Sequence, residues 1–367
     1  MTDKPQFVEE RGQKVKLNNL CSRGKSSLRQ KDVSNNGPYA VYGASGLVGT
    51  MASFQNTVPY VAVVKDGAGV GRASACEANT SVLGTMQALI PREGIDRDYL
   101  LHLVRSLHLG DGFSGSTIPH IYFKDYGKLP VRLHSPAEQK RIVDIFASIE
   151  RQIKVSKQQL DQLDSLVKSR FVDMFGDPII NPKNWQTKRL GSMGELKNGV
   201  NFKSVDNGYE VKCLSVRDFK DKYSIDDMSQ IGKVSLNGRP NASQMLKNGD
   251  IVFVRSNGNK ALVGRCLAVF PKDEKLTFSG FCIRFRIESN DINLDYFLNC
   301  MKSDSMRKAM IGRGANIQNL SQAILSKLSI PIPPLSLQQE FVDFARQVNK
   351  SRFVAQQQIE KLQMLYD

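Results

Sequence analysis

The feature that most constrains this chain is an internal repeat. When residues 115–168 are placed on residues 314–367 without a gap, 12 of the 54 positions are identical. Similarity at one fixed offset indicates that a chain is built from copies of one structural unit. The identical positions include the pairs Gly115/Gly314, Gln139/Gln338 and Leu163/Leu362. The sequence therefore predicts two copies of one structural plan.

Each copy contains a long stretch in which apolar or small residues follow a heptad pattern. In the first copy, spacings of four and three residues alternate along Ile142, Phe146, Ile149, Ile153, Ser156, Leu160, Leu163 and Val167. The second copy has, at the same positions, Phe341, Ala345, Val348, Arg352, Ala355, Ile359, Leu362 and Tyr366. A narrow heptad stripe is what a helix needs to pair lengthwise with another helix. We therefore predict two long helices joined along a coiled-coil seam.

Capping residues predict where these helices begin and end. Ser135 and Glu138 have the spacing of an N-cap and its capping-box partner. Gly176 predicts the end of the first helix. Ser336 and Gln339 predict a comparable capping box for the second helix.

The segments before the helices consist of short apolar runs interrupted by glycine, with a helical patch in the first segment. Such runs predict strands and turns. The fold class is therefore α+β, with two similar mixed α/β globular domains, each followed by a long helix. The expected boundaries are a flexible lead-in at 1–13, globular domains at 14–134 and 186–334, long helices at 135–176 and 335–367, and a linker at 177–185.

Charge and composition narrow the functional class. Lys and Arg number 51 against 36 Asp and Glu, which gives a net charge of +15. An excess of this size favours a polyanionic partner, usually nucleic acid, although a generally basic protein without such a partner is the alternative. No apolar run is long enough to span a membrane and the first residues are polar, which predicts a cytoplasmic protein. The six cysteines form no C-x-x-C pair and are expected to be reduced and buried.

Motifs for catalysis are incomplete. Gly24-Lys25-Ser26 lacks the upstream glycine of a phosphate-binding loop, and 67–72 lacks the third glycine of a dinucleotide fingerprint. A tight turn between strands explains 67–72 better. The four histidines offer neither metal-ligand spacing nor a partner for a nucleophile. We therefore predict no catalytic residue, no cofactor and no bound metal.

Candidate DNA-binding residues lie on turns that follow predicted strands and on the segments around Gly115 and Gly314. On such turns, Arg and Lys can reach phosphates or guanine edges and Asn can pair with adenine. Solvated turn residues, or a structural turn before each helix, are the alternatives. The candidates are Lys65, Arg72, Ser116, Thr117, Arg255, Asn257, Asn259, Lys260, Arg265, Arg313 and Asn316.

The helix starts at Pro136–Val143 and Pro333–Gln338, and the closing segment Arg170–Asp177, resemble those of the specificity subunit of type I restriction–modification systems. The resemblance covers the chain from Lys14 onward. It implies a non-catalytic subunit in which each globular block is a target recognition domain. Each domain would read one half of a bipartite, asymmetric site in double-stranded DNA.

The resemblance also implies partners and a helix arrangement. The two helices would run antiparallel, set the spacing of the half-sites and dock two methyltransferase subunits, with motor-nuclease subunits joining for restriction. Outward positions such as Gln139 and Arg141 would face these partners. The alternative is a scaffold protein whose helices mediate assembly and whose globular domains bind protein rather than DNA.

Overall fold

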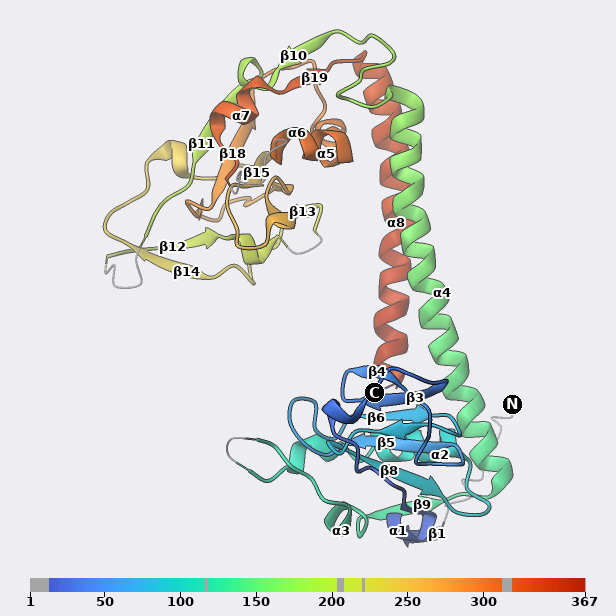
Figure 1. Cartoon of the computed structure of the whole chain (residues 1–367). Helices are drawn as coiled ribbons and strands as arrows, with labels where there is room; N and C mark the ends of the chain where they lie inside the picture. The colour runs from blue at the N-terminus through green and yellow to red at the C-terminus, as the bar shows by residue number, and fades with distance from the viewer. Residues whose placement is uncertain (1–12, 116–117, 203–207, 220–221, 312–318, 367) are drawn as a thin grey trace, which may run out of the picture. The chain divides into compact units, whose positions relative to one another are not determined.

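The chain forms two compact units. The computed structural model describes residues 13–115, 118–202, 208–219, 222–311 and 319–366. Unit 1 comprises the chain up to Ser156 together with the segment from Gln358 onward, and unit 2 comprises Lys157–Gln357. The long helices α4 (Pro136–Phe175) and α8 (Leu335–Tyr366) each contribute a segment to both units (Figure 1).

Unit 1 is built on a four-stranded antiparallel sheet, a three-stranded sheet and a two-stranded ribbon. The first has the order β2-β8-β5-β6, with bounds Cys21–Arg23, Met86–Pro91, Tyr60–Val64 and Ala73–Cys76. The second has the order β4-β3-β7, with bounds Gly46–Met51, Tyr39–Gly43 and Ser81–Val82. The ribbon pairs β1 (Gln13–Lys16) with β9 (Pro130–Leu133). Its helices before α4 are α1 (Leu17–Leu20), α2 (Arg97–Arg105) and α3 (Phe123–Tyr126).

The central strand β5 is buried on both faces because successive side chains of a strand point to opposite sides of the sheet. Val61 and Val63 pack in one cluster with Leu100 and Val104 of α2. The alternate residues Tyr60, Ala62 and Val64 pack in a second cluster on the other face. A continuous apolar run is what a strand covered on both faces requires.

Unit 2 repeats this topology. Its main sheet has the order β11-β18-β15-β16-β13, with bounds Gly194–Asn198, Cys282–Ile287, Asp250–Val254, Cys266–Val269 and Ser224–Ile225. Its smaller sheet has the order β14-β12-β17, with bounds Lys233–Leu236, Tyr209–Leu214 and Leu276–Phe278. The ribbon pairs β10 (Thr187–Arg189) with β19 (Ser329–Pro331). Its short helices are α5 (Leu294–Lys302), α6 (Asp304–Ile311) and α7 (Gln322–Lys327).

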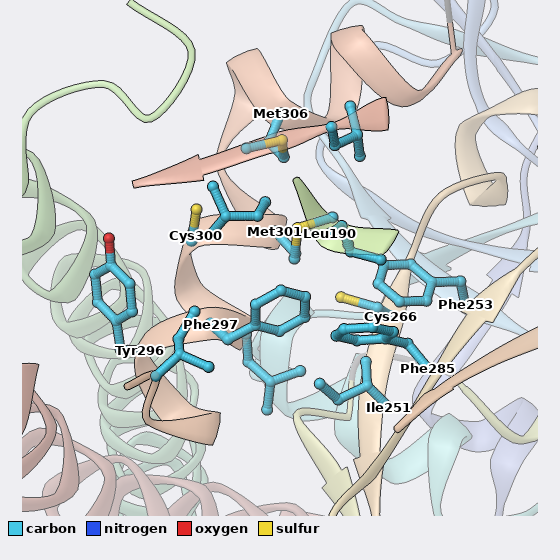
Figure 2. Close-up of a cluster of buried hydrophobic side chains, with 14 of the residues drawn as sticks. Leu190, Ile251, Phe253, Cys266, Phe285, Tyr296, Phe297, Cys300, Met301 and Met306 are labelled. Carbon is cyan, nitrogen blue, oxygen red and sulfur yellow. The ribbon is translucent and has the colours of Figure 1, made fainter. Parts of the chain in front are cut away.

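The core of unit 2 lies between its main sheet and α5. Figure 2 shows Ile251 and Phe253 from β15, with Phe285 from β18, facing Phe297 and Met301 of α5. The predicted fold class is therefore confirmed, because both globular parts share the order of four main-sheet strands, to which unit 2 adds β13 at the edge, and each precedes a long helix. All six cysteines are buried and free, as expected.

The two long helices run antiparallel. In unit 2, Arg352 pairs with Asp164 at 2.9 Å, and Glu340 pairs with Arg170 at 3.1 Å. From Asp164 to Arg170 the residue number rises along α4, while the number of the paired residue on α8 falls from Arg352 to Glu340. Pairs that run in opposite directions in this way are expected for antiparallel helices. Every position of the predicted heptad stripe is buried or half-buried in both helices.

The helix ends follow the capping expectations at α4 but not at α8. The Glu138 amide donates to Ser135 Oγ at 3.3 Å, and Gly176 ends α4 with a φ of +79°. The capping box predicted at Ser336 is wrong because α8 begins one residue earlier, at Leu335. Pro334 occupies the cap position, and its carbonyl accepts from the Leu337 amide at 3.0 Å.

Candidate nucleic-acid interface

In each unit, the central strand ends in a hairpin loop that carries predicted DNA-binding residues. Loop 1, residues 65–72, joins β5 to β6, and loop 2, residues 255–265, joins β15 to β16. An equivalent hydrogen bond closes each loop. The Val64 amide donates to the Arg72 carbonyl in loop 1, and the Val254 amide donates to the Arg265 carbonyl in loop 2, both at 2.8 Å. The expectation that residues 67–72 form a turn between strands is therefore confirmed.

A glycine before each closing arginine makes the turn possible. Gly71 has a φ of +86° and Gly264 a φ of +78°, in the region that favours glycine. At Gly71, an added Cβ would also lie 2.2 Å from the Gly110 amide nitrogen. The shared Val-Gly-Arg sequence thus marks one backbone conformation used twice.

A hydrogen bond from a later segment of the chain, at Ile121 in unit 1 and Leu320 in unit 2, also holds each loop. The Ile121 amide donates to the Lys65 carbonyl at 3.0 Å, and the Leu320 amide donates to the Arg255 carbonyl at 2.8 Å. His120 Nδ1 lies 2.7 Å from Asp66 Oδ1, which ties this segment to loop 1. Residues 120–121 in unit 1 and residue 320 in unit 2 are therefore the described parts of this segment that contact the loops. Four of the candidates, Ser116, Thr117, Arg313 and Asn316, lie outside the described residues.

Loop 1 presents Arg72 on its surface. The Arg72 side chain is exposed and donates from Nε to the Gly69 carbonyl at 3.3 Å and from Nη2 to the Ala44 carbonyl at 3.2 Å. These bonds hold the guanidinium in place while the rest of its edge faces solvent. Lys65 is half-buried at the base of the loop. An oriented guanidinium of this kind suits contact with a phosphate or a guanine edge.

The two asparagines of loop 2 stabilise the loop itself. Asn257 Oδ1 accepts from the Asn259 amide at 2.8 Å, and Asn259 Oδ1 accepts from the Ala261 amide at 3.0 Å. Their amide oxygens therefore already have partners within the turn. Of the cationic candidates, Lys260 is exposed and Arg265 is half-buried.

Two further residues beside loop 2 were not found from the sequence. Arg307 of α6 donates from Nη2 to the Ala261 carbonyl at 2.8 Å and to the Val263 carbonyl at 3.3 Å. Burial and the neighbouring Arg265 cation hold the pKa of Arg307 below its usual range. A phosphate beside this pair of arginines would relieve their mutual repulsion. No sequence pattern linked Arg307 to the loop, because it belongs to a helix more than forty residues away.

The second missed residue is Phe281, whose side chain is 62% exposed. The Arg255 amide donates to the Phe281 carbonyl at 2.8 Å, so the backbone of Phe281 lies next to the base of loop 2. An exposed aromatic ring beside cations can contact DNA bases or sugars. The sequence signals that could have pointed to Phe281 were the adjacent Gly280 and the strand that precedes it.

The predicted seam residues lie on the facing sides of the two helices. Val348 and Ile359 are buried, and the others are half-buried, namely Ile142, Phe146, Ile149, Ile153, Leu160, Leu163 and Leu362. In unit 1, the Phe146 and Tyr366 rings meet edge to face with centroids 5.5 Å apart. In unit 2, the Phe171 and Phe341 rings do the same at 5.4 Å.

The expectation that Gln139 faces outward is corrected, because this side chain is only 1% exposed. Its Oε1 accepts from the Asp96 amide at 2.9 Å, and its Nε2 donates to the Gly94 and His134 carbonyls at 3.1 and 3.0 Å. Gln139 therefore joins the start of α4 to the start of α2. Arg141 is exposed and lies 3.8 Å from Glu138.

Gln338 makes the same contacts in unit 2. Its Oε1 accepts from the Asn293 amide at 2.8 Å, and its Nε2 donates to the Asp291 and Pro333 carbonyls at 3.0 and 2.8 Å. The identity of Gln139 and Gln338 in the repeat thus has a structural cause. We call each of these three-bond arrangements a glutamine clamp.

The helices also carry exposed apolar residues outside the seam. Two pairs occupy equivalent positions of the repeat: Val155 and Val354 are 54% and 63% exposed, and Leu166 and Leu365 are 47% and 69% exposed. Apolar residues repeated at exposed positions are a sequence signal for a surface that contacts another protein.

Within the described residues, no helix combines the length and apolar content needed to span a membrane. In the same part of the chain, no three His, Cys, Asp or Glu side chains are grouped as metal ligands would be. Lys25 of the incomplete phosphate-binding motif has its amide bound to Asn56 Oδ1 at 3.0 Å. No α-helix follows this motif directly in the described chain, whereas a phosphate-binding loop opens into one.

The fold and the paired loops define a chain of two like domains, each presenting a cationic hairpin, joined by antiparallel helices. The family model for the type I restriction modification DNA specificity domain matches the chain twice, over residues 9–165 and 182–364. The chain therefore belongs to this family.

Curated relatives agree with this assignment. The StySPI type I restriction enzyme specificity subunit of Salmonella potsdam is 27% identical over 278 residues, which cover 70% of this chain and 59% of that protein. The MjaIX specificity subunit of Methanocaldococcus jannaschii is 22% identical over 303 residues, which cover 76% of this chain and 68% of that protein. The chain thus matches about three-fifths of the length of the StySPI subunit.

Solved structures share the fold over the whole chain. One is a chain from a study of complex assembly and conformational transition of the type I restriction–modification system, with a TM-score of 0.62, 15% identity, and coverage of 99% of this chain and 97% of that one. Another is the type I restriction–modification S subunit from M. genitalium, with a TM-score of 0.53, 15% identity, and coverage of 100% and 97%.

Proposed function

We propose that this chain is the non-catalytic DNA sequence-recognition subunit of a type I restriction–modification complex. The observation that carries the proposal is the pair of equivalent hairpin loops, which one backbone framework presents with different side chains. Loop 1 offers Lys65 and Arg72, whereas loop 2 offers Arg255, Lys260 and Arg265. The net charge of +15 supports phosphate contacts.

In this proposal, residues 14–134 and 186–334 are two target recognition domains, and each reads one half of a bipartite site in double-stranded DNA. The segments 135–176 and 335–367 are the spacer helices, 177–185 is the linker between them, and 1–13 is a lead-in. Because the two loops differ in length and side chains, the two half-sites differ in sequence. The target is therefore asymmetric.

The helices supply the docking surface for two methyltransferase subunits in a cytoplasmic complex, to which motor-nuclease subunits add restriction. The repeated exposed pairs Val155/Val354 and Leu166/Leu365, with Arg141, support this part of the proposal. Their apolar surface is what a partner helix would bury. Gln139 is not part of that surface.

Methylation-site mapping tests the function. DNA from cells that contain this chain and its methyltransferase subunits is sequenced for modified adenine, and footprinting of the purified complex is done in parallel. We expect two short specified sequences separated by unread base pairs, both protected. A single contiguous footprint would contradict two-domain reading, and DNA retention that is absent or insensitive to salt would favour the scaffold alternative.

Loop substitutions separate the two domains. The double substitution of Arg255 and Lys260 by Ala should weaken recognition of one half-site by roughly 1–3 kcal/mol for each base-specific hydrogen-bonding pair that is removed. Substitution of Lys65 and Arg72 should weaken the other. Lys350→Ala, an exposed cation on α8, is the matched control. Equal losses on both half-sites from either pair would refute independent reading.

A further inference from the structure

Unit 2 contains a cavity of about 380 Å³ between its helices. Its wall includes Val167 and Phe171 of α4, Asn299 and Lys302 of α5, and Ala345 of α8. Pockets that bind small molecules have volumes of about 300–1,000 Å³. The cavity is therefore large enough for a small ligand.

The internal repeat shows how the equivalent space is filled in unit 1. There, Phe146 stands at the position of Ala345, and Tyr366 stands at the position of Val167. His102 of α2 takes the place that Asn299 has in α5. The His102 and Phe146 rings stack with centroids 4.1 Å apart, and Tyr366 packs edge-on against Phe146. In unit 2 the smaller side chains of Ala345, Val167 and Asn299 stand where unit 1 has rings, and the space between them is the cavity.

The contacts of the charged residue at the end of α2 also differ from those of its equivalent in α5. Arg105 at the end of α2 lies 3.8 Å from Glu150 and donates a hydrogen bond to the Tyr366 hydroxyl. At the equivalent position of α5, Lys302 extends over the face of the Tyr223 ring, 3.9 Å from its centroid. Asn349 replaces Glu150 in the repeat.

In the part of the chain that the structure describes, no carboxylate forms an ion pair with Lys302, whereas its counterpart Arg105 lies beside Glu150. Burial lowers the pKa of Lys302 from its ordinary value. A desolvated ammonium at the wall of a cavity gains from an anion that enters it.

Two of the three carboxylates that line the cavity have partners of their own. Asp164 pairs with Arg352 at 2.9 Å, and at Lys302 the charge of Asp164, which raises the lysine pKa, is opposed by that of Arg352, which lowers it. Asp177 Oδ1 accepts from the amides of Ile179 and Ile180 at 2.9 and 3.1 Å. Asp304 lies in the first turn of α6. None of them takes the role that Glu150 has beside Arg105.

We propose that this cavity binds a small aromatic acid. Its ring occupies the space that Phe146 and Tyr366 fill in unit 1, and its carboxylate pairs with Lys302. Tyr223 and Phe171 supply apolar and aromatic surface for the ring. The proposal does not rest on DNA recognition, since no loop residue of either hairpin takes part.

The test uses the full chain and 4-hydroxyphenylacetate as the probe, with isothermal titration calorimetry and ligand-observed NMR. We expect saturable binding at one site. Lys302→Met should weaken it about tenfold or more, because the variant has no ammonium to pair with the carboxylate. The neutral probe 4-methylphenol should bind the Lys302→Met variant and the unaltered chain alike. Arg105→Met, the matched change in unit 1, should leave binding of the acid unchanged.

Ala345→Phe restores the residue that fills the space in unit 1 and should abolish binding of both probes. It should also raise the melting temperature, so loss of binding cannot be attributed to unfolding. Saturable binding that neither Lys302→Met nor Ala345→Phe alters would place the ligand elsewhere and overturn the proposal. Absence of saturable binding to the unaltered chain would overturn it as well.

Discussion

Replacing a clamp glutamine by leucine should destabilise the unit that contains it, which is unit 1 for Gln139 and unit 2 for Gln338. Leucine has a similar volume but can make none of the three hydrogen bonds of Gln139 or Gln338. Each missing bond leaves a backbone amide or carbonyl without its partner. The cost per bond is about 1 kcal/mol when water can replace the side chain, and more when it cannot.

The two clamps differ in exposure, and this sets the order of the effects. Of the residues that Gln139 contacts, Gly94 and Asp96 are exposed and His134 is half-buried, so water can reach the first two most easily. Asp291 and Asn293 are half-buried, and Pro333 is buried. We therefore expect Gln139→Leu to lower the free energy of unfolding by about 2 kcal/mol and Gln338→Leu by about 3 kcal/mol. For domains of this size, the melting temperature should fall by about 4–8 °C and 6–12 °C.

Equilibrium urea denaturation followed by far-ultraviolet circular dichroism measures both effects. Trp185, the one tryptophan of the chain, lies in unit 2 and donates from its indole nitrogen to the Phe175 carbonyl at 3.0 Å. Its fluorescence therefore reports on Gln338→Leu separately. The control is Gln159→Leu, an exposed glutamine of α4, which should change stability by less than about 0.5 kcal/mol. If Gln139→Leu keeps the original urea midpoint but no longer binds the methyltransferase subunit, the clamp interpretation is refuted and Gln139 is a partner contact after all.

Three further perturbations test the helix seam, the ion pair between the buried Arg284 and Glu195, and the thiols. Leu160→Asp should lower the free energy of unfolding by about 2 kcal/mol because it places a charge in the seam. Leu166→Asp, at a position that is 47% exposed, should change the free energy of unfolding little. Equal urea midpoints for the two variants would contradict the seam. The hydrogen bond from Arg284 lowers the pKa of Glu195, so this pair stabilises unit 2 above the ordinary glutamate pKa of about 4.3, and the contribution is lost as the pH falls through the lowered value. Glu195→Gln should remove that step from an acid titration of stability. All six thiols should resist an aromatic disulfide reagent until guanidinium is added, since each is buried and burial raises the pKa of Cys21 to about 12; labelling of the folded chain would disprove this.

The long helices were predictable because their signal is local and periodic. A residue such as Ile149 or Leu163 is placed on the seam by its distance from the previous apolar residue alone, and no distant part of the chain needs to be known. The hairpins were predictable for a similar reason, since Val-Gly-Arg follows an apolar strand in both copies. The order of strands within each sheet could not be derived, because it depends on pairings such as β5 with β8 across intervening segments.

The roles of single side chains were harder to predict, and Gln139 shows why. A polar residue repeated at the start of a long helix fits a contact with another subunit or a buried structural bond equally well. The distinction depends on whether a backbone turn from elsewhere, here residues 94–96, lies against the helix. Arg307 was missed for the converse reason, since it reaches loop 2 only after α6 has packed beside it.

The two hairpins combine a shared framework with different tips, which is what the proposed recognition of two different half-sites requires. Both hairpins are closed by an arginine carbonyl, turned by a glycine with positive φ, and held by an amide from the later segment. These three constraints fix where a tip lies in its domain without fixing which side chains it bears. Loop 2 is longer, and Asn257 and Asn259 stabilise its extra residues, whereas loop 1 is short and glycine-rich. A loop can therefore change its side chains without disturbing the sheet, the clamp or the helix seam. Under the proposed function, exchange of loop 2 alone should alter one half-site while leaving the other half-site and the spacing unchanged.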